Sequence, residues 1–386
     1  MKIATIVGAR PQFIKAAVVS RAISQSNKLV TEVIVHTGQH YDRNMSDVFF
    51  EEMSIPRPDY FLDINGISHG AMTGQMLEKI EEVLLKEKPD IVLVYGDTNT
   101  TLAGGLAAAK LHIPVAHVEA GLRSFNRRMP EEINRVLTDH VANILFCPTQ
   151  QAVENLKDEG IGIEGASAHK LVSSSPNQTI SLRALSYELP PMVALVGDVM
   201  YDSVLFYLKT AEKNSKIIEK LDLKSKAYAL ATVHRAENTD DSHRLQSIFE
   251  ALEKISAEGL PVVLPLHPRT RKFVPASRFS DTKIKIIEPV SYLDMLQLEQ
   301  QAQLILTDSG GVQKEAYWMK VPCITLRDET EWIETVEAGW NILAGADRDK
   351  IIESANAGRN PSAQYPAYGD GRAGEKIVAI LGQPGF

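Results

Sequence analysis

The sequence predicts an α/β protein with two doubly wound parallel sheets. Short apolar runs rich in β-branched residues recur along all 386 residues with little polar alternation, which is typical of strands buried on both faces. Segments with helical spacing lie between most of these runs, and such strand–helix alternation indicates parallel sheets covered by helices. The predicted strands are 2–9, 31–38, 90–97, 115–121, 144–149, 193–198, 228–234, 262–267, 284–289, 304–309 and 322–327.

The number of strands indicates two domains. Eleven strands are more than one twisted sheet readily holds, and 386 residues suffice for about two cores. We predict Rossmann-like domains over 1–196 and 197–369 that face each other across a cleft. Residues 160–192, rich in Gly, Ser and Pro, are predicted to form a surface insertion in the first domain. An apolar helix at about 370–386 is expected to pack back on that domain.

Composition excludes several classes of protein. The net charge of −8 argues against a nucleic-acid-binding surface, and no apolar run reaches the roughly 18 residues of a membrane span. The first residues, MKIATIVGARPQF, lack a signal-peptide cleavage site. Cys147 and Cys323 lie in separate apolar strands, which favours buried thiols in a reducing cytoplasm. The histidines are scattered and no cluster has metal-ligand spacing, so no metal is expected.

Polar side chains follow many of the predicted strands. In open α/β sheets, ligands bind beyond the carboxyl ends of the strands. Each residue also has an ordinary structural explanation, because Asp97 fits a helix N-cap, a histidine can simply end a strand, and Arg327 fits a surface ion pair. Together they favour a site, since both domains deliver such residues to one edge. The residues are Arg10, Gln39, His40, Asp97, Glu119, His234, His267, Ser309 and Arg327.

A Gly-Gly turn in LILTDSGGVQKEA (304–316) indicates an anion site. Ser309, Gly310 and Gly311 join a predicted strand to a helix, where unpaired N–H groups and the helix dipole favour a phosphate. The D-S-G-G pattern is not that of an acyl nucleophile. Arg10 and Lys15 offer positive charge from the first domain, and no G-x-G-x-x-G or Walker motif follows the first strand. The prediction is a nucleoside diphosphate in the interdomain cleft rather than NAD or ATP in their usual modes.

Carboxylates supply candidate acid and base groups. Asp97 and Glu119 end consecutive predicted strands, so they are expected to lie within several ångströms of each other. In RMPEEINRVLTDH, Pro130 precedes Glu131 and Glu132 in the first turn of a helix. Acids at this position complement the helix dipole, and a share in the site is the alternative.

These motifs resemble those of the non-hydrolysing UDP-N-acetylglucosamine 2-epimerases, a family with the two-domain GT-B fold. The likeness covers nearly the whole chain except about 160–192. It implies an isomerase that interconverts UDP-GlcNAc and UDP-ManNAc for surface polysaccharide synthesis, without a redox cofactor, by eliminating UDP and adding it back. The motifs are VGARPQFIKAA, HTGQHYD, VYGDTNTTLAG, AHVEAGLRS, MPEEINRVLTD, VGDVMYDS, TVHRAEN, PLHPRT, TDSGGVQKEA and LRDETEW.

The resemblance implies roles for the matching positions. The family's catalytic acids fall on Asp97, Glu119 and Glu131, and its catalytic histidine falls on His234. Asp97 and Glu131 are expected to carry protons on opposite faces of the sugar, while Glu119 orients them and His234 assists at the phosphate or the sugar. The implied UDP or substrate contacts are Arg10, His267, Ser309, Gly310, Gly311, Glu315 and Arg327.

Three further positions match residues linked either to the catalytic site or to a second, activating UDP-GlcNAc. They are Lys15, Gln39 and His40. Relatives are commonly homodimers, and closure of the domains over the ligand is expected.

Two departures from the common family pattern point to a neighbouring branch. RDETEWIE (327–334) stands where many members read RDTTERPE, and VHRAEN (233–238) stands where they read GHRRE. These variants resemble the branch that epimerises UDP-2,3-diacetamido-2,3-dideoxyglucuronate, an O-antigen precursor. Trp332 replaces an arginine and so changes the local charge. The alternatives are a GT-B glycosyltransferase, a hydrolysing epimerase and a catalytically silent sugar-nucleotide-binding regulator.

Overall fold

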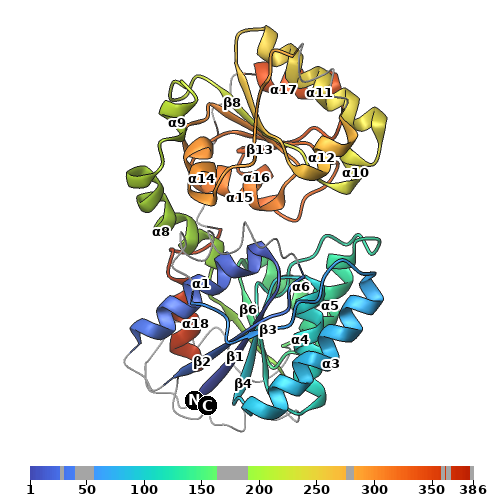
Figure 1. Ribbon diagram of the computed structural model, residues 1–386, viewed down its shortest axis with the longest axis vertical. Helices are drawn as coiled ribbons and strands as arrows, with labels where there is room; N and C mark the ends of the chain where they lie inside the picture. The colour runs from blue at the N-terminus through green and yellow to red at the C-terminus, as the bar shows by residue number, and fades with distance from the viewer. Residues whose placement is uncertain are drawn as a thin grey trace. The chain divides into compact units, whose positions relative to one another are not determined.

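The computed structural model describes residues 1–26, 30–39, 56–162, 190–274, 282–357, 361 and 367–382. The chain divides into two compact units (Figure 1). Unit 1 comprises Met1–Ser203 and Pro366–Phe386, and unit 2 comprises Val204–Tyr365. The division falls inside one helix, α8 (Val199–Asn214).

Unit 1 is built on a seven-stranded parallel sheet in the order β3-β2-β1-β4-β5-β6-β7. Helices α3, α4 and α5 pack side by side on one face, and α1 and α18 pack together on the other (Figure 1). The strands are β1 (Lys2–Val7), β2 (Thr31–His36), β3 (Tyr60–Phe61), β4 (Ile91–Tyr95), β5 (Val115–Val118), β6 (Ile144–Cys147) and β7 (Met192–Leu195). The helices are α1 (Arg10–Gln25), α3 (His69–Glu87), α4 (Asn99–Lys110), α5 (Pro130–Val141), α6 (Gln150–Asp158) and α18 (Ala373–Leu381).

Small residues let helix α4 lie close to this sheet. A Cβ on Gly104 would lie 3.1 Å from Val94 Cγ1 and 3.2 Å from Ile6 Cβ. Since both neighbours are buried in the sheet, neither has room to yield. The Ala-Gly-Gly stretch of the helix therefore fixes its distance from β1 and β4, and with it the position of the loop that follows β4.

Unit 2 repeats the architecture with a six-stranded parallel sheet in the order β10-β9-β8-β11-β12-β13. The strands are β8 (Ala229–Thr232), β9 (Val262–Pro265), β10 (Lys285–Ile287), β11 (Leu304–Thr307), β12 (Cys323–Thr325) and β13 (Asn341–Leu343). The helices are α9 (Ile217–Lys220), α10 (Ala236–Thr239), α11 (Ser242–Ala257), α12 (Pro268–Phe273), α14 (Tyr292–Gln301), α15 (Gly310–Trp318), α16 (Ile333–Glu337) and α17 (Arg348–Asn356).

Both faces of the unit 2 sheet are covered by apolar side chains. Leu306 belongs to the core on one face, with Ile248 and Leu252 of α11. Its neighbour Ile305 belongs to the core on the other face, with Leu298 of α14. Successive strand residues point to opposite faces, so a strand with two covered faces needs an uninterrupted apolar run.

The predicted fold class is confirmed, and each of the eleven predicted runs contains a strand. Two edge strands, β3 and β13, were not predicted. Strand β7 begins at Met192, the last residue of the predicted insertion, and most of that insertion, 163–189, lies outside the described residues. The prediction placed the domain boundary at 196/197, and helix α18 belongs to unit 1.

One sequence expectation has a direct structural counterpart. Cys147 and Cys323 are buried free thiols in strands of different sheets. Among the described helices, none combines the length and the hydropathy that crossing a bilayer requires. The described part of the chain also holds no group of three or more His, Cys, Asp or Glu side chains placed to bind a metal ion.

Buried His36 makes unit 1 sensitive to acid. Its ring packs between Phe13 and Phe61, with centroid distances of 4.6 and 4.8 Å, and Nδ1 accepts a hydrogen bond from the Gly38 amide at 2.8 Å. Burial lowers the pKa of His36 from 6.5 to about 4. The unfolded chain therefore takes up a proton at a higher pH than the folded chain.

We expect the stability that His36 contributes to be complete above pH 6.5 and to be lost as the pH falls from 6.5 towards 4. A His36→Gln variant should show a shallower loss of melting temperature across this window, because glutamine does not titrate. The exposed His243 provides a control, since His243→Gln should leave the wild-type slope unchanged. Equal slopes for His36→Gln and wild type would contradict the assignment.

Candidate active site

Asp97 and Glu119 lie side by side at one edge of the unit 1 sheet. Tyr95, the last residue of β4, pairs with Val118, the last residue of β5, and the Gly96 amide donates to the Val118 carbonyl at 3.0 Å. A Cβ placed on Gly96 would lie 3.2 Å from Glu119 Oε2. The structure thus brings the two predicted acids together, as expected from consecutive parallel strands.

Glu119 is held by an ion pair with Lys15 of helix α1. Both side chains are buried, that of Glu119 being 7% exposed. Glu119 also has a φ of 73°, in the left-handed region that non-glycine residues seldom occupy. Backbone strain of this kind persists only where the surroundings fix it, and it is common at functional sites.

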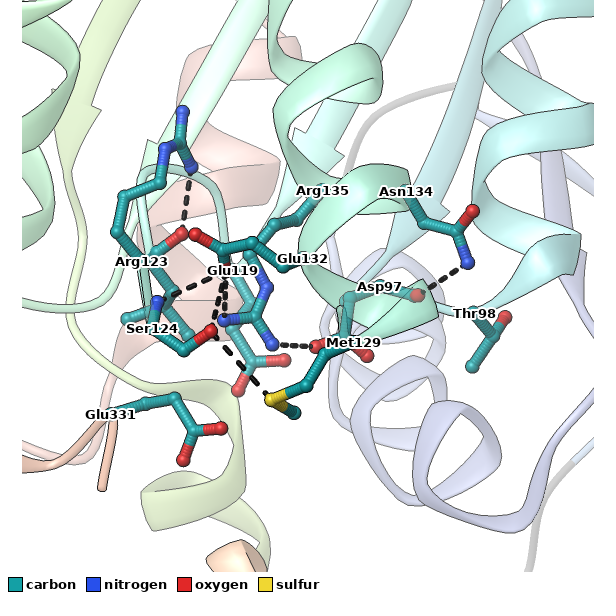
Figure 2. A network of polar contacts seen from close by, with 12 residues as sticks. Asp97, Thr98, Glu119, Arg123, Ser124, Met129, Glu132, Asn134, Arg135 and Glu331 are labelled. Atoms are coloured by element: carbon teal, nitrogen blue, oxygen red, sulfur yellow. Dashed lines mark hydrogen bonds and ion pairs between the residues drawn. The ribbon is translucent and has the colours of Figure 1, made fainter. Parts of the chain in front are cut away.

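Asp97 is held by Arg135 of helix α5, as Figure 2 shows. Arg135 Nη1 also donates to Glu132 Oε2 at 3.1 Å, so one guanidinium joins the two acids. The amide side chain of Asn134 donates to the Asp97 carbonyl at 3.0 Å. The carboxylate of Asp97 is nevertheless 32% exposed, which leaves it accessible to a ligand.

The two glutamates of the PEE sequence have different surroundings. Glu132 is buried and accepts hydrogen bonds from the amides of Ser124 and Phe125 at 3.0 and 2.9 Å. Its carboxylate therefore fixes the loop that precedes α5. Glu131 is half-buried and its side chain has no hydrogen bond or ion pair with any residue of the described segments. Of the pair, Glu131 is the one available for a reacting group.

Gln39 lies at the same sheet edge. Its Oε1 accepts hydrogen bonds from the amide and hydroxyl of Thr100, at 3.1 and 2.9 Å, in the first turn of α4. His40 lies outside the described residues, and Arg10 opens helix α1 with a side chain that is likewise outside them.

The backbone N–H groups before helix α1 are bound by a side chain of that helix. The amides of Gly8 and Ala9 donate to Gln12 Oε1 at 2.8 and 3.0 Å. A Cβ on Gly8 would lie 2.0 Å from Thr37 Oγ1, so the turn is also tightly packed. The backbone donors of this strand–helix turn are therefore already bound within unit 1.

Asp308 organises the corresponding edge of unit 2. Its buried carboxylate accepts from the backbone amides of His234 and Arg235, each at 2.9 Å, and from Asn238 Nδ2 at 3.1 Å. The His234 ring is also paired with it, with Nδ1 at 3.2 Å from Oδ1. Burial works to raise the pKa of Asp308, but the hydrogen bonds and charge of His234 outweigh it, so the pKa lies below its usual value. Asp308 thus holds the loop after β8 and orients His234.

His234 and His267 lie next to each other in unit 2, with ring centroids 5.2 Å apart. His267 precedes helix α12, and its Nδ1 accepts from the Arg269 amide at 3.1 Å. When this ring is neutral, its proton is on Nε2. The structure brings together two histidines that the sequence placed at the ends of neighbouring strands.

Ser309 begins helix α15 and caps it, with Oγ 3.5 Å from the Val312 amide. A Cβ on Gly311 would meet only Ser309 Oγ, at 3.8 Å, whereas one on Gly310 would lie 3.1 Å from Trp332 Nε1. A side chain at position 310 would therefore press against Trp332. Packing does not require a glycine at position 311.

Glu315 lies deeper in α15, where it is buried and accepts from the Tyr292 hydroxyl at 3.2 Å. Burial, and then the neighbouring Glu315 charge, raise the pKa of Glu299 well above its usual value.

Arg327 is 1% exposed. Its guanidinium pairs with Glu331 at 3.0 Å and with Glu237 at 3.4 Å. This burial favours a role in holding the loop that begins at Arg327 over the direct UDP contact that the resemblance implied. The alternative reading of the sequence was an ion pair at the surface. The ion pair is present, but the Arg327 side chain is buried.

Several residues that shape these sites were missed by sequence reasoning. Arg135 and Asp308 are the partners of Asp97 and His234, and the separations in sequence are 38 and 74 residues. No local spacing predicts such contacts. Asp308 did carry a signal, because it stands between a strand end and the capping Ser309.

The fold and these side chains define an α/β protein with a carboxylate cluster on one parallel sheet and a glycine-rich helix N-terminus on the other. The family model described as UDP-N-acetylglucosamine 2-epimerase matches residues 21–382. The chain belongs to this family and is an isomerase. The resemblance inferred from the sequence motifs is thereby confirmed.

Similar proteins include two close relatives. A Pseudomonas aeruginosa UDP-2,3-diacetamido-2,3-dideoxy-D-glucuronate 2-epimerase is 53% identical over 99% of both chains. A Methanocaldococcus jannaschii UDP-N-acetylglucosamine 2-epimerase is 47% identical over 99% of both chains. The structure of a UDP-GlcNAc 2-epimerase from M. jannaschii in complex with UDP-GlcNAc and UDP matches with a TM-score of 0.84, 46% identity and 99% coverage of both chains.

Gly96 offers a test of the unit 1 site. An added Cβ would lie 3.1 Å from Lys15 Nζ and 3.2 Å from Glu119 Oε2, at a φ of +64°. We expect Gly96→Ala to displace the Lys15–Glu119 pair by a few tenths of an ångström and to lower epimerase kcat by about tenfold or more.

The matched control for this prediction is Gly66→Ala. Gly66 has a similar φ of +69° but open space around the added Cβ. It should therefore show the backbone strain, roughly 1–2 kcal/mol, without the loss of kcat. Equal kcat values for the two variants would contradict the prediction.

Proposed function

We propose that this enzyme interconverts the C2 epimers UDP-GlcNAc and UDP-ManNAc by eliminating UDP and adding it back. The observation that carries the proposal is the pair of carboxylates Asp97 and Glu119 on the unit 1 sheet edge, together with Glu131 in the first turn of α5, in a member of this family. The M. jannaschii structure with UDP-GlcNAc and UDP, 46% identical to this chain, supports the substrate class.

The chemistry explains why such a site needs several acids. No carbonyl acidifies the C2 proton of the sugar, so the bond from C1 to the β-phosphate oxygen must break, with its electron pair leaving on UDP. The C2 proton passes to a base and a C1=C2 double bond forms. UDP then returns to C1 while an acid delivers a proton to the opposite face of C2. Two groups on opposite faces are therefore required.

The surroundings of the three acids support a division of roles. Glu119 is paired with Lys15 and buried, which suits an orienting group better than a proton carrier. Asp97 is partly exposed, and Glu131 has no side-chain partner within the described segments. We assign proton transfer to Asp97 and Glu131. Lys15 acts at the catalytic centre through Glu119, and Gln39 and His40 are left for a second, activating UDP-GlcNAc.

Unit 2 supplies the groups for the leaving UDP. The first turn of α15, which begins with Gly310 and Gly311 after the cap Ser309, offers backbone N–H groups and the positive end of the helix dipole. His234, oriented by Asp308, stabilises the departing phosphate charge together with His267 and, from unit 1, Arg10. Glu315 holds the ribose hydroxyls. These groups act on the charge that develops in the transition state.

The second candidate substrate is UDP-2,3-diacetamido-2,3-dideoxyglucuronate. The 53% identity to the P. aeruginosa enzyme of that name favours it, as does the RDETEWIE sequence. Trp332 of this segment is buried and packs against Lys314, with Nζ 3.9 Å from the ring centroid. Because Trp332 stands where many family members have an arginine, this chain lacks that positive charge next to the N-terminus of α15.

We also propose that the enzyme works in the cytoplasm as a homodimer. The two buried free thiols support a reducing compartment. Sizing by light scattering should give about twice the 42.6 kDa chain mass, and a monomer at assay concentrations would contradict the dimer.

Solvent exchange tests the reaction. We expect UDP-GlcNAc incubated with the enzyme in D₂O to gain deuterium at C2 and to yield the manno epimer, as followed by NMR. The same assay with the diacetamido-glucuronate nucleotide decides between the two substrates. No deuterium in either nucleotide would refute the proposal and favour a glycosyltransferase, and release of free N-acetylmannosamine would indicate a hydrolysing enzyme.

Asp97→Asn should lower the exchange rate by about 10³-fold, because an amide cannot carry the proton. UDP affinity should stay within a few-fold of wild type, since the UDP groups are assigned mainly to unit 2. Asp158→Asn, an exposed site at the end of α6, is the control and should retain full exchange. Loss of UDP binding together with exchange would make Asp97 structural instead.

A further inference from the structure

A charged network of three buried side chains and one exposed glutamate lies next to the carboxylate edge of unit 1. It joins His117 of β5, Asp139 of α5, Arg123 in the loop between them, and Glu159 just after α6. His117 and Asp139 are fully buried. None of the four residues has a role in the proton transfer or the phosphate binding proposed above. Burying a charge is costly unless it is paired, so the network calls for another explanation.

Both ring nitrogens of His117 face hydrogen-bond acceptors. Nε2 lies 2.7 Å from the Gly96 carbonyl oxygen, and Nδ1 lies 2.7 Å from Asp139 Oδ1. A carbonyl and a carboxylate can only accept, so both nitrogens must donate, and the ring is an imidazolium. Arg123 forms a two-point pair with Glu159, with Nε and Nη2 each 2.7 Å from a carboxylate oxygen. With two cations and two anions, the network is neutral.

Asp139 binds the chain on both sides of Glu119. Oδ1 accepts from His117, two residues before Glu119, and Oδ2 accepts from the Gly121 amide, two residues after it, at 3.1 Å. Oδ2 also accepts from Arg123 Nη1 at 2.7 Å. Burial raises the pKa of Asp139, but the interactions with His117 and Arg123 lower it by more. The pKa therefore lies below its usual value and the carboxylate is ionised.

These contacts account for the unusual backbone at Glu119. Its φ of 73° and the φ of 80° at Gly121 place two left-handed residues in one short turn. A Cβ on Gly121 would lie 2.3 Å from the Ala152 carbonyl oxygen, so the turn is pressed against α6. Hydrogen bonds to residues 117 and 121 hold the turn from both ends. His117 also fixes the Gly96 carbonyl, directly before Asp97.

We propose that His117 and Asp139 are positioning residues that fix the backbone next to the two carboxylates Asp97 and Glu119. His117 acts through Gly96 on the first, and Asp139 acts through the 117–121 turn on the second. The inference rests on the proposed function for the roles of the two acids. On this proposal, His117 and Asp139 do not contact the sugar nucleotide, and they determine the positions of the enzyme's proton-transfer group Asp97 and orienting group Glu119.

The kinetic test compares two substitutions. His117→Phe keeps a ring but removes both hydrogen bonds, so kcat should fall at least about tenfold while UDP affinity is unchanged. Asp139→Asn can keep every contact, because its amide N–H can donate to Nδ1 of a neutral His117 while Oδ1 accepts from Gly121 and Arg123. Its kcat should stay within about threefold of wild type. His140→Phe, an exposed site on the same helix, is the matched control.

Assays well below the melting temperature of each variant separate positioning from mere stability. A purely structural role would lower the melting temperature and leave kcat of the folded enzyme unchanged, and a wild-type kcat for folded His117→Phe would overturn the proposal. Failure of the proposed function is distinguishable, because it appears as absence of exchange in the wild-type enzyme. If His117→Phe does not fold, NMR of wild-type enzyme labelled with ¹⁵N-histidine decides. Two protonated His117 nitrogens support the proposal, and one bare nitrogen overturns it.

Discussion

Buried carboxylates with fixed partners are the feature on which the rest of this enzyme depends. Taking an ionised carboxylate out of water costs several kcal/mol unless charge and hydrogen bonds compensate. Glu119 is compensated by Lys15, and Asp308 by the backbone amides and ring of the loop after β8. Because each partner comes from a different element, pairing the charge also locks the elements together. The electrostatic requirement and the positional requirement are met by the same contacts.

In both sheets the candidate site residues follow the carboxyl ends of parallel strands. A parallel strand covered on both faces ends at a rigid edge, and the next few residues turn back into a helix. In unit 1 the edge gathers acids, with Asp97 and Glu119 after β4 and β5. In unit 2 it gathers histidines and a glycine-rich helix start after β8, β9 and β11. On the proposed function, the acids of unit 1 serve proton transfer and the glycine-rich helix start of unit 2 serves the departing diphosphate.

Most of the fold was predictable from the sequence because strands buried on both faces need apolar runs, and all eleven runs of that kind contain strands. Strands β3 and β13 were not predicted, and both lie at sheet edges where most of their residues are only partly buried. In the site, the residues at strand ends were found because topology brings them to one edge. Two of their partners, Arg135 and Asp308, were not found. Glu131 and Glu132 are neighbours of the same type, and only the three-dimensional contacts of Glu132 with Ser124 and Phe125 distinguish them. His117 was read only as part of an apolar strand, because its partner Asp139 is 22 residues away in the sequence.

Gln12 makes the two similar sheets inequivalent. By taking up the Gly8 and Ala9 amides, its side chain closes in unit 1 the type of strand–helix turn that stays available at Ser309 in unit 2. The Gly8 and Ala9 amides are therefore bound by a side chain of their own helix and are not available to a phosphate.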